Sequence, residues 1–435
     1  MHHANKPGVR LREVDIPGKS RGLVALTDIS AGDVLILEQP ECFIIGNTDA
    51  CEHCGQWTWR SSDALRRALD GREDLIAQAL FEAGITEPHP CAGAQCDRCS
   101  RRWCSSRCRL AGAASHAFLC AIGEDLCPLW AAPGHFRLFA VAIAKAISGA
   151  LEATDANGHR KETEPASCFL ECFCSPSSVR ATLDIELGFL QQVAPSVAAL
   201  RREFEERLAT SHEPLERIAA VPLIQRWLTA EGYQRFHCMT RANGQEIHVP
   251  SPVTGLLARM LQAAPASAAV QACVRACLEL NGTRTAAGGD LLRKLGGSGQ
   301  ALFKIHSKLN HSCTPNALVM QTGVDAGMIV RAAAPILAGD EVCICYLDLE
   351  PDGALESPSA KAKGVATVAA RRQELLVRYG FWCSCERCFG DDLRIFLSDR
   401  QHAATFKFVK TTVQRPNVHL CTDLFTSLRQ MTLLS

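Results

Sequence analysis

Asn310-His311-Ser312-Cys313-Thr314-Pro315-Asn316 is the stretch that decides the fold of this 435-residue chain. It is followed by Gly339-Asp340-Glu341, by Tyr346 and then by Cys383-x-Cys385-x2-Cys388. Each motif alone is weak evidence for a fold, but the order and the separation of the motifs together are specific evidence. The three downstream thiols lie within six residues, one ligand short of the tetrahedron that structural zinc requires. The alternative for this last cluster is a redox-active Cys-x-Cys.

Eight residues farther upstream have the spacing of zinc ligands: Cys51, Cys54, Cys96, Cys99, Cys104, Cys108, His116 and Cys120. A C-x2-C pair places two thiolates on one turn, where both can bind the same ion. Eight ligands are enough for two ions, and the spacing alone leaves sequential and interleaved pairing open. The alternative is a set of unligated cysteines in a hydrophobic core.

Composition narrows the class of protein. The chain has 23 cysteines but no secretory signal, so thiols and metal ligands are favoured over disulfides. Basic and acidic side chains number 46 each, which gives no indication of a general nucleic-acid or membrane-surface binder. The most apolar stretch, residues 138–151, contains Lys145 and is too short to span a bilayer. We therefore expect a soluble intracellular protein of two or three modules.

Hydrophobic patterns alternate between strand and helix along the chain. Strands are predicted within residues 9–38 and at 317–320, 328–332 and 341–347. Helices are predicted at 63–83, over most of 133–280 (including 183–208, 214–230 and 253–280) and at 367–379. Residues 351–366, rich in Pro, Gly, Ala and Ser, predict a loop, and residues 389–435 have no strong periodicity.

Together the motifs resemble the catalytic half of a SET domain with an early MYND zinc module, the layout of the SET and MYND domain family of protein-lysine methyltransferases. The resemblance covers roughly residues 8–390. It implies an α+β fold in which small SET strands surround a knot-like core. The implied parts are an N-terminal SET segment (8–50), the MYND-type zinc finger (51–120), a helical insertion (121–280), the SET core (281–350), a zinc-binding post-SET segment (367–390) and a short tail (391–435).

The resemblance also implies how the ligands pair. One zinc ion would be held by Cys51, Cys54, Cys104 and Cys108, a second by Cys96, Cys99, His116 and Cys120, and a third by Cys313, Cys383, Cys385 and Cys388. Two departures from the family pattern concern the MYND-type module. The stretch from Cys54 to Cys96 is unusually long, and Ala113 replaces a common aromatic residue. Because of these departures, Cys51 and Cys54 are the less certain pair of ligands, and Cys91 is an alternative ligand in their place.

By resemblance, the S-adenosylmethionine site comprises Lys19, Arg21, Gly22, Asn281, Asn310, His311, Tyr346 and Phe381. Asn310 and His311 would cradle the cofactor, Phe381 would stack on its adenine, and the Tyr346 hydroxyl would orient the methyl group and the incoming amine. Methyl transfer is an in-line displacement in which positioning dominates, so no covalent nucleophile is required. Ser20 stands where the family has a glycine, which brings a side chain close to the cofactor.

We therefore expect an S-adenosylmethionine-dependent protein-lysine N-methyltransferase that acts on a histone tail or another protein. The expected location is the cytoplasm and nucleus, the expected state is a monomer, and a proline-rich peptide is the expected partner of the MYND-type module. Members of the family often carry a helical C-terminal domain after the last cysteine cluster, whereas only 47 residues follow Cys388 here. The expectation is either an open substrate groove or a tail that comes from an incomplete or alternative chain. The alternative function is a zinc-binding interaction scaffold whose SET core transfers methyl groups weakly.

Overall fold

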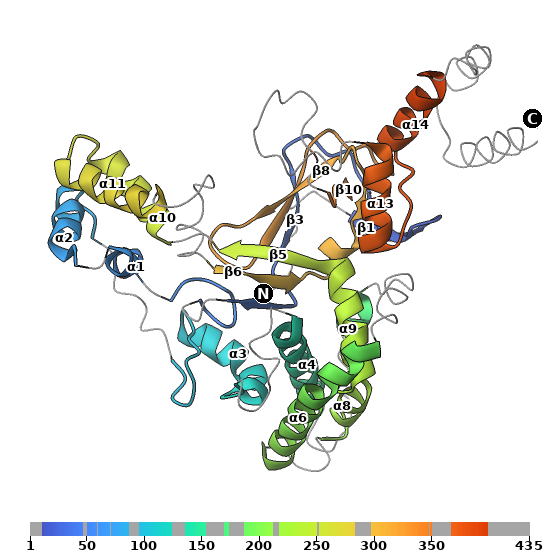
Figure 1. Ribbon diagram of the computed structural model, residues 1–435, viewed down its shortest axis with the longest axis horizontal. Helices are drawn as coiled ribbons and strands as arrows, with labels where there is room; N and C mark the ends of the chain where they lie inside the picture. The colour runs from blue at the N-terminus through green and yellow to red at the C-terminus, as the bar shows by residue number, and fades with distance from the viewer. Residues whose placement is uncertain are drawn as a thin grey trace, which may run out of the picture.

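The computed structural model describes residues 11–46, 50–58, 60–69, 71–86, 95–123, 135–153, 169–173, 187–211, 217–249, 252–282, 297–347, 349 and 367–398. Small β-sheets form the centre of this part of the chain, and helices lie around them on three sides in the view of Figure 1. The mixed content confirms the predicted α+β class. Within the described ranges, no helix has the length and apolarity needed to cross a membrane.

Four sheets bring together strands from distant parts of the sequence. β1 (Leu11–Ile16) and β2 (Ser20–Ala25) form an antiparallel hairpin. β3 (Val34–Glu38), β9 (Met328–Ala332) and β8 (Ala317–Gln321) form one antiparallel sheet in that order, and β4 (Cys42–Ile45), β6 (Gly297–Leu302) and β5 (Gly244–Val249) form another. β7 (Asn310–His311) and β10 (Cys343–Ile344) form a short parallel pair. The central sheets are therefore assembled from strands that lie far apart in the sequence.

The apolar core of these sheets follows from strand alternation. In β9, Met328, Val330 and Ala332 are buried, while the residues between them are partly exposed. Val330 packs in one cluster with Leu35 of β3 and Leu23 of β2. Because side chains alternate between the two faces of a strand, the register of β9 determines which residues enter this core.

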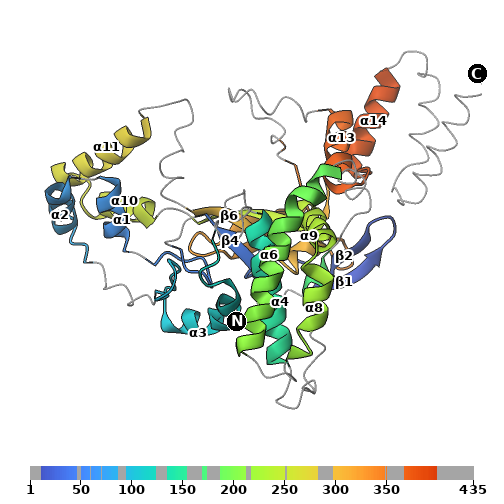
Figure 2. The same cartoon turned by 60° about the horizontal axis from the view of Figure 1, so that its bottom comes forward.

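A second core lies under β4 and consists of helices α4 (His135–Glu152), α6 (Leu187–Ser211), α8 (Val221–Trp227) and α9 (Ala230–Asn243). These helices form one bundle in Figure 2. Phe136, Phe139 and Phe236 are fully buried between them. Burial of such rings contributes most of the stability of a helical layer.

A third core explains the long stretch between Cys54 and Cys96. It contains α1 (Ser61–Ala68) and α2 (Glu73–Glu82), which are too short to be stable alone. Their apolar residues Leu65 and Ile76 pack instead against α10 (Pro252–Ala263) and α11 (Ala268–Gly282). The four helices form a separate group beside the sheets in Figure 1.

The structure corrects several of the helix and strand ranges that the sequence predicts. β5 lies inside the range that was expected to be helical, because its backbone completes the sheet edge of β6. Residues 264–267 interrupt the predicted helix 253–280. α14 (Glu386–Ser398) extends into residues 389–435, where the sequence has no strong periodicity. α13 (Val368–Tyr379) confirms the predicted helix, and the expected loop at 351–366 lies outside the described residues.

Glu38 supports the turn that leads into the Asn-His-Ser-Cys segment. This residue is 1% exposed, and its carboxylate accepts hydrogen bonds from the backbone N–H groups of Ile305 at 2.7 Å and His306 at 2.9 Å. Burial raises the pKa of Glu38 to about 7, although these hydrogen bonds oppose the change. A buried carboxyl group therefore joins β3 to the site.

We predict that Glu38 makes stability pH-dependent. The folded pKa lies above that of an unfolded glutamate, near 4, so the contribution is complete below about pH 4 and is lost as the pH rises through about 7. Relative to Glu38→Gln, the wild type should lose on the order of 3 kcal/mol between pH 4 and pH 8. Urea unfolding of both proteins at several pH values checks this difference. Glu279→Gln, at an exposed position on α11, should show no such trend; equal trends for both variants would contradict the assignment.

Candidate active site and metal centres

Glu341 joins three of the predicted site segments. One of its carboxylate oxygens lies 2.6 Å from Lys19 Nζ, and the other accepts from Asn310 Nδ2 at 2.8 Å. The same Asn310 amide also donates to the Arg21 carbonyl at 2.8 Å. The sequence identified Glu341 as part of a motif but gave it no role. Its position shows that it holds the β1–β2 hairpin against the Asn-His-Ser-Cys segment.

Gly22 permits this close approach. A Cβ atom at this position would lie 2.7 Å from Asn310 Nδ2 and 2.4 Å from Ile16 Cδ1. Both contacts are shorter than packed atoms allow, so any larger residue would displace the Asn310 amide. The requirement for glycine at position 22 therefore comes from packing against Asn310.

His311 uses both ring nitrogens inside the protein. Its Nδ1 accepts from the backbone N–H of Tyr346 at 3.0 Å, and its Nε2 lies 3.2 Å from the Cys313 sulfur. Burial lowers the pKa of His311 to about 4, so the ring is neutral near pH 7 and carries its proton on Nε2, facing the sulfur. The ring therefore connects the Tyr346 backbone to the Cys313 sulfur.

Tyr346 lies in a group of aromatic rings. The ring centroid of Tyr346 lies 5.3 Å from that of His311, 4.8 Å from that of Tyr379 and 6.3 Å from that of Phe381. The Tyr346 hydroxyl donates to the backbone carbonyl of Leu309. Tyr379, at the end of α13, was not predicted as a site residue, since a single tyrosine in a helix gives no signal in the sequence.

One predicted site residue is not placed by the described structure. Asn281 is in the last turn of α11, and its side chain lies outside the described residues. The side chain of Ser20, the first residue of β2 and the departure from the family glycine, also lies outside them. The cofactor contact predicted for Asn281 and the effect predicted for Ser20 stay predictions.

Cys313 meets the three cysteines of the post-SET segment. Its sulfur lies 4.0 Å from that of Cys383 and 3.6 Å from that of Cys388, and Cys385 completes a group of four ligand atoms. Two arginines of α13 hold the following helix α14 in place. Buried Arg371 binds Asp391 at 2.6 Å, and Arg372 binds both oxygens of Asp392 at 2.8 and 2.7 Å.

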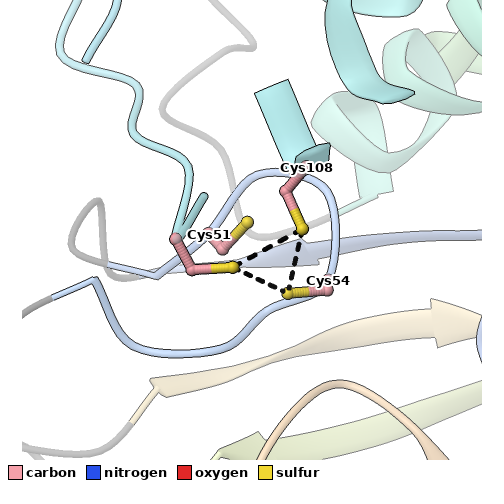
Figure 3. Close-up of side chains that lie close together, drawn as sticks. Cys51, Cys54 and Cys108 are labelled. Atoms are coloured by element: carbon pink, nitrogen blue, oxygen red, sulfur yellow. Dashed lines mark hydrogen bonds between the residues drawn. The ribbon is translucent and has the colours of Figure 1, made fainter. Parts of the chain in front are cut away.

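The helix α3 (Ser106–Leu119) organises the other two groups. Cys108 lies in its first turn, where Ser105 caps the helix by accepting from the Cys108 N–H. His116 lies in its last turn. The sulfurs of Cys51, Cys54 and Cys108 point toward one another in Figure 3. One helix therefore contributes to both groups, and the ligands form the interleaved sets Cys51, Cys54, Cys104, Cys108 and Cys96, Cys99, His116, Cys120.

The distances within all three groups suit zinc. Tetrahedral zinc with bonds of about 2.3 Å to sulfur separates its sulfurs by about 3.8 Å, whereas a disulfide requires about 2 Å. Sulfur pairs lie 3.5 Å apart for Cys104 and Cys108, and 3.6 Å apart for Cys96 and Cys120. Cys91, the substitute considered for the first pair, lies outside the described residues. The four-atom sets are complete without it.

Glu52 orients one of these ligands. His116 Nε2 faces the Cys99 sulfur at 3.7 Å, and His116 Nδ1 lies 2.7 Å from a carboxylate oxygen of Glu52. The Nδ1 and carboxylate atoms are close but imperfectly aligned, and neither has another hydrogen-bond partner among the described residues. A carboxylate behind a zinc-ligating histidine determines its tautomer and strengthens it as a ligand. The zinc-ligand spacing gave no signal for this role.

Comparison with known proteins gives the family. The family model of the SET domain matches residues 20–347. The chain belongs to the SET domain family. The match begins in the β1–β2 hairpin and ends just beyond Tyr346, so the core assembled from distant strands is the SET domain itself.

Similar proteins of this family belong to the SMYD group. The chain is 23% identical over 416 residues to the protein-lysine N-trimethyltransferase SMYD5 of Gallus gallus. This match covers 88% of this chain and 87% of that protein. It is 35% identical over 94 residues, 22% of this chain and 18% of the relative, to the histone-lysine N-methyltransferase SMYD3 of Mus musculus. These relatives confirm the resemblance to SET and MYND proteins. A solved structure, the SET domain of LSMT bound to lysine and AdoHcy, matches 87% of this chain and 54% of its own chain at 12% identity, with a TM-score of 0.27.

We predict three zinc ions per chain, one for each ligand set. Elemental analysis of purified protein checks the number. Cys313→Ser should remove one ion and destabilise the segment from α13 to α14, because binding at a structural zinc site contributes folding free energy. Unchanged zinc content in Cys313→Ser would contradict the shared site.

We also predict that Glu52→Ala weakens one zinc site selectively. Loss of a carboxylate behind a ligating histidine typically lowers metal affinity about 10- to 100-fold. In competition with a chelator, one ion should become labile while the other two are released as in the wild type. Asp97→Ala, which removes an exposed carboxylate between Cys96 and Cys99, serves as the control. Equal lability in the two variants would refute a specific role for Glu52.

Proposed function

We propose that this SET domain protein is an S-adenosylmethionine-dependent protein-lysine N-methyltransferase. The observation that carries this proposal is the position of Tyr346, whose hydroxyl donates to the Leu309 carbonyl within a group of aromatic rings from two distant segments. The named activities of SMYD5 and SMYD3 support the proposal.

The chemistry of the residues around Tyr346 fits S-adenosylmethionine. The rings of Tyr346, Tyr379 and Phe381 are partly exposed, and aromatic faces attract cations such as a sulfonium and stack on flat rings such as adenine. The Arg21 guanidinium donates to the Cys172 carbonyl and lies 3.9 Å from Glu13 Oε1, but its Nε is buried without a hydrogen-bond partner in the described part of the chain, which leaves one donor for a carboxylate. When bound, the cofactor supplies a methyl group activated by its sulfonium.

The chain contributes alignment and a polar contact. The Tyr346 hydroxyl donates a hydrogen bond to the Leu309 carbonyl. Its oxygen therefore keeps lone pairs that can contact the polarised methyl group or the amine. His311 holds the Tyr346 backbone in place. The attacking lysine must be neutral, and a desolvated site lowers the pKa of an amine. The rate should therefore rise with pH until the bound amine has lost its proton.

We expect Tyr346→Phe to slow methyl transfer on the order of a hundredfold or more, because it removes a preorganised polar contact and keeps the ring. Cofactor affinity should change far less. Single-turnover transfer of labelled methyl groups to a lysine-containing protein, together with a cofactor titration, measures both quantities.

Tyr233→Phe is the matched control, since it removes a hydroxyl from the buried core between α4 and α9. This control should transfer methyl groups at the wild-type rate. Near-normal transfer by Tyr346→Phe would make Tyr346 a packing residue. Cofactor binding without transfer in the wild type would favour the interaction-scaffold alternative.

The finer features of this function are also proposals. We propose that the substrate is a histone tail or another protein with an accessible lysine, and that the protein works as a monomer in the cytoplasm and nucleus. The MYND-type module is proposed to bind a proline-rich peptide. Zinc is proposed for all three ligand sets on the basis of their ligand types and distances.

A further inference from the structure

A cavity of about 220 Å³ lies where the MYND-type module meets the SET domain and the helical layer. Arg137, Val141 and Lys145 line one side of it. They are spaced four residues apart on α4 and so share one helix face. β4, α3 and the loops of both zinc-ligand sets close the other sides. The volume is below the range of about 300–1,000 Å³ that is typical of whole-ligand pockets, so the cavity suits a small group.

The cavity is lined by more positive than negative side chains. Arg101, Arg137 and Lys145 face one carboxylate, that of Glu52. Glu52 is already engaged, because it lies beside the zinc ligand His116 at 2.7 Å and only 3.9 Å from Arg101 Nε. Lys145 donates to the backbone carbonyl of Glu41 at 3.0 Å, and no described ion pair involves its ammonium group, although the charges of Glu41 and Glu52 act on it from farther away.

Arg137 has the least compensation. Its Nε is buried and has no hydrogen-bond partner among the described residues. Burial and the like charge of Arg101 together lower the pKa of Arg137 to about 10, although the charge of Glu52 opposes this change. A partly desolvated guanidinium beside a second one is unfavourable unless an anion pairs with it. Planar guanidinium groups bind carboxylate and phosphate oxygens especially well.

Zinc-bound thiolates are the other source of negative charge at this junction, since Cys51 and Cys99 also line the cavity. A cation that balanced them directly would donate to their sulfurs, as the Arg371 guanidinium does to Cys388 at 3.6 Å. No described hydrogen bond joins Arg101, Arg137 or Lys145 to a ligand sulfur. The positive charge is therefore available to an added group.

We propose that this cavity is a binding site for an oxyanion, a phosphate or carboxylate group that pairs with Arg137 and Arg101. The group enters from solvent as a free ion or on the side chain of another polypeptide. The site is separate from Tyr346 and does not depend on the methyl-transfer proposal. It gives the junction between the zinc module and the SET domain a ligand of its own.

Titration calorimetry on the full, zinc-loaded chain at constant ionic strength tests the proposal. The probes are inorganic phosphate, N-acetyl-phosphoserine amide and N-acetyl-glutamate amide, with chloride as the competing anion. We expect saturable binding of at least one probe that is weakened tenfold or more in Arg137→Gln. The probe that binds best distinguishes a free phosphate from a phosphorylated or an acidic side chain.

Arg202→Gln, the same change at an exposed position on α6, is the matched control and should bind as the wild type does. Lys145→Gln is the second test variant in case Arg137→Gln does not fold, and it should also weaken binding. Absence of saturable binding in the wild type overturns the proposal, as does equal affinity in the variants and the control. Loss of zinc from Arg137→Gln without anion binding by the wild type also overturns it, because the arginine would then balance the thiolates.

Discussion

The contact of the Cys313 sulfur with the post-SET cysteines is the constraint on which the site depends. It joins a turn in the middle of the SET core to a segment about seventy residues farther along the chain, at sulfur distances of 3.6 and 4.0 Å. The neighbouring His311 carries this constraint to Tyr346 through a backbone hydrogen bond. Phe381 and Tyr379 flank the same cysteines, so the aromatic rings are positioned by the metal-ligand group. A metal ion held by these four cysteines would therefore act on the site indirectly, through His311 and the neighbouring rings.

Glu341 is a second point at which one residue joins distant segments of the chain. Glu341 receives Lys19 and Asn310 on its two oxygens, and the amide of Asn316 brackets the same strand by binding the Glu341 carbonyl and the Cys343 N–H, each at 2.8 Å. The hairpin that precedes the zinc module is therefore held to residues more than three hundred positions away. Close approach at Gly22 is what allows these polar groups to meet in a packed interior.

The MYND-type module meets helix α4 at a junction that is lined by charged side chains. Glu52 belongs to the loop of one ligand set and orients a histidine of the other. Its carboxylate also faces the arginine-lined cavity against α4. The negative charges at this junction come from thiolates and one carboxylate, and the positive charges come from two arginines and one lysine. The proposed oxyanion would pair with the arginines. The helices α1 and α2, which lie between Cys54 and Cys96, pack their apolar faces on α10 and α11 and not on this junction.

The sequence by itself determined the family resemblance, the number of ligand sets and the main strands and helices, because ligand spacing and side-chain periodicity are local properties. It also indicated Tyr346 and the Asn-His-Ser-Cys turn. Ligand spacing left open which ligands belong to one set, and the tertiary structure brings together the interleaved sets that the resemblance implied, since α3 separates Cys108 from His116 by its own length. The tertiary structure alone assigned β5 to a sheet, where hydrogen bonding to β6 overrides the helical character of the flanking residues. The roles of Glu341, Glu52, Tyr379 and Arg137 likewise depend on partners far away in the chain, and no local pattern encodes such contacts.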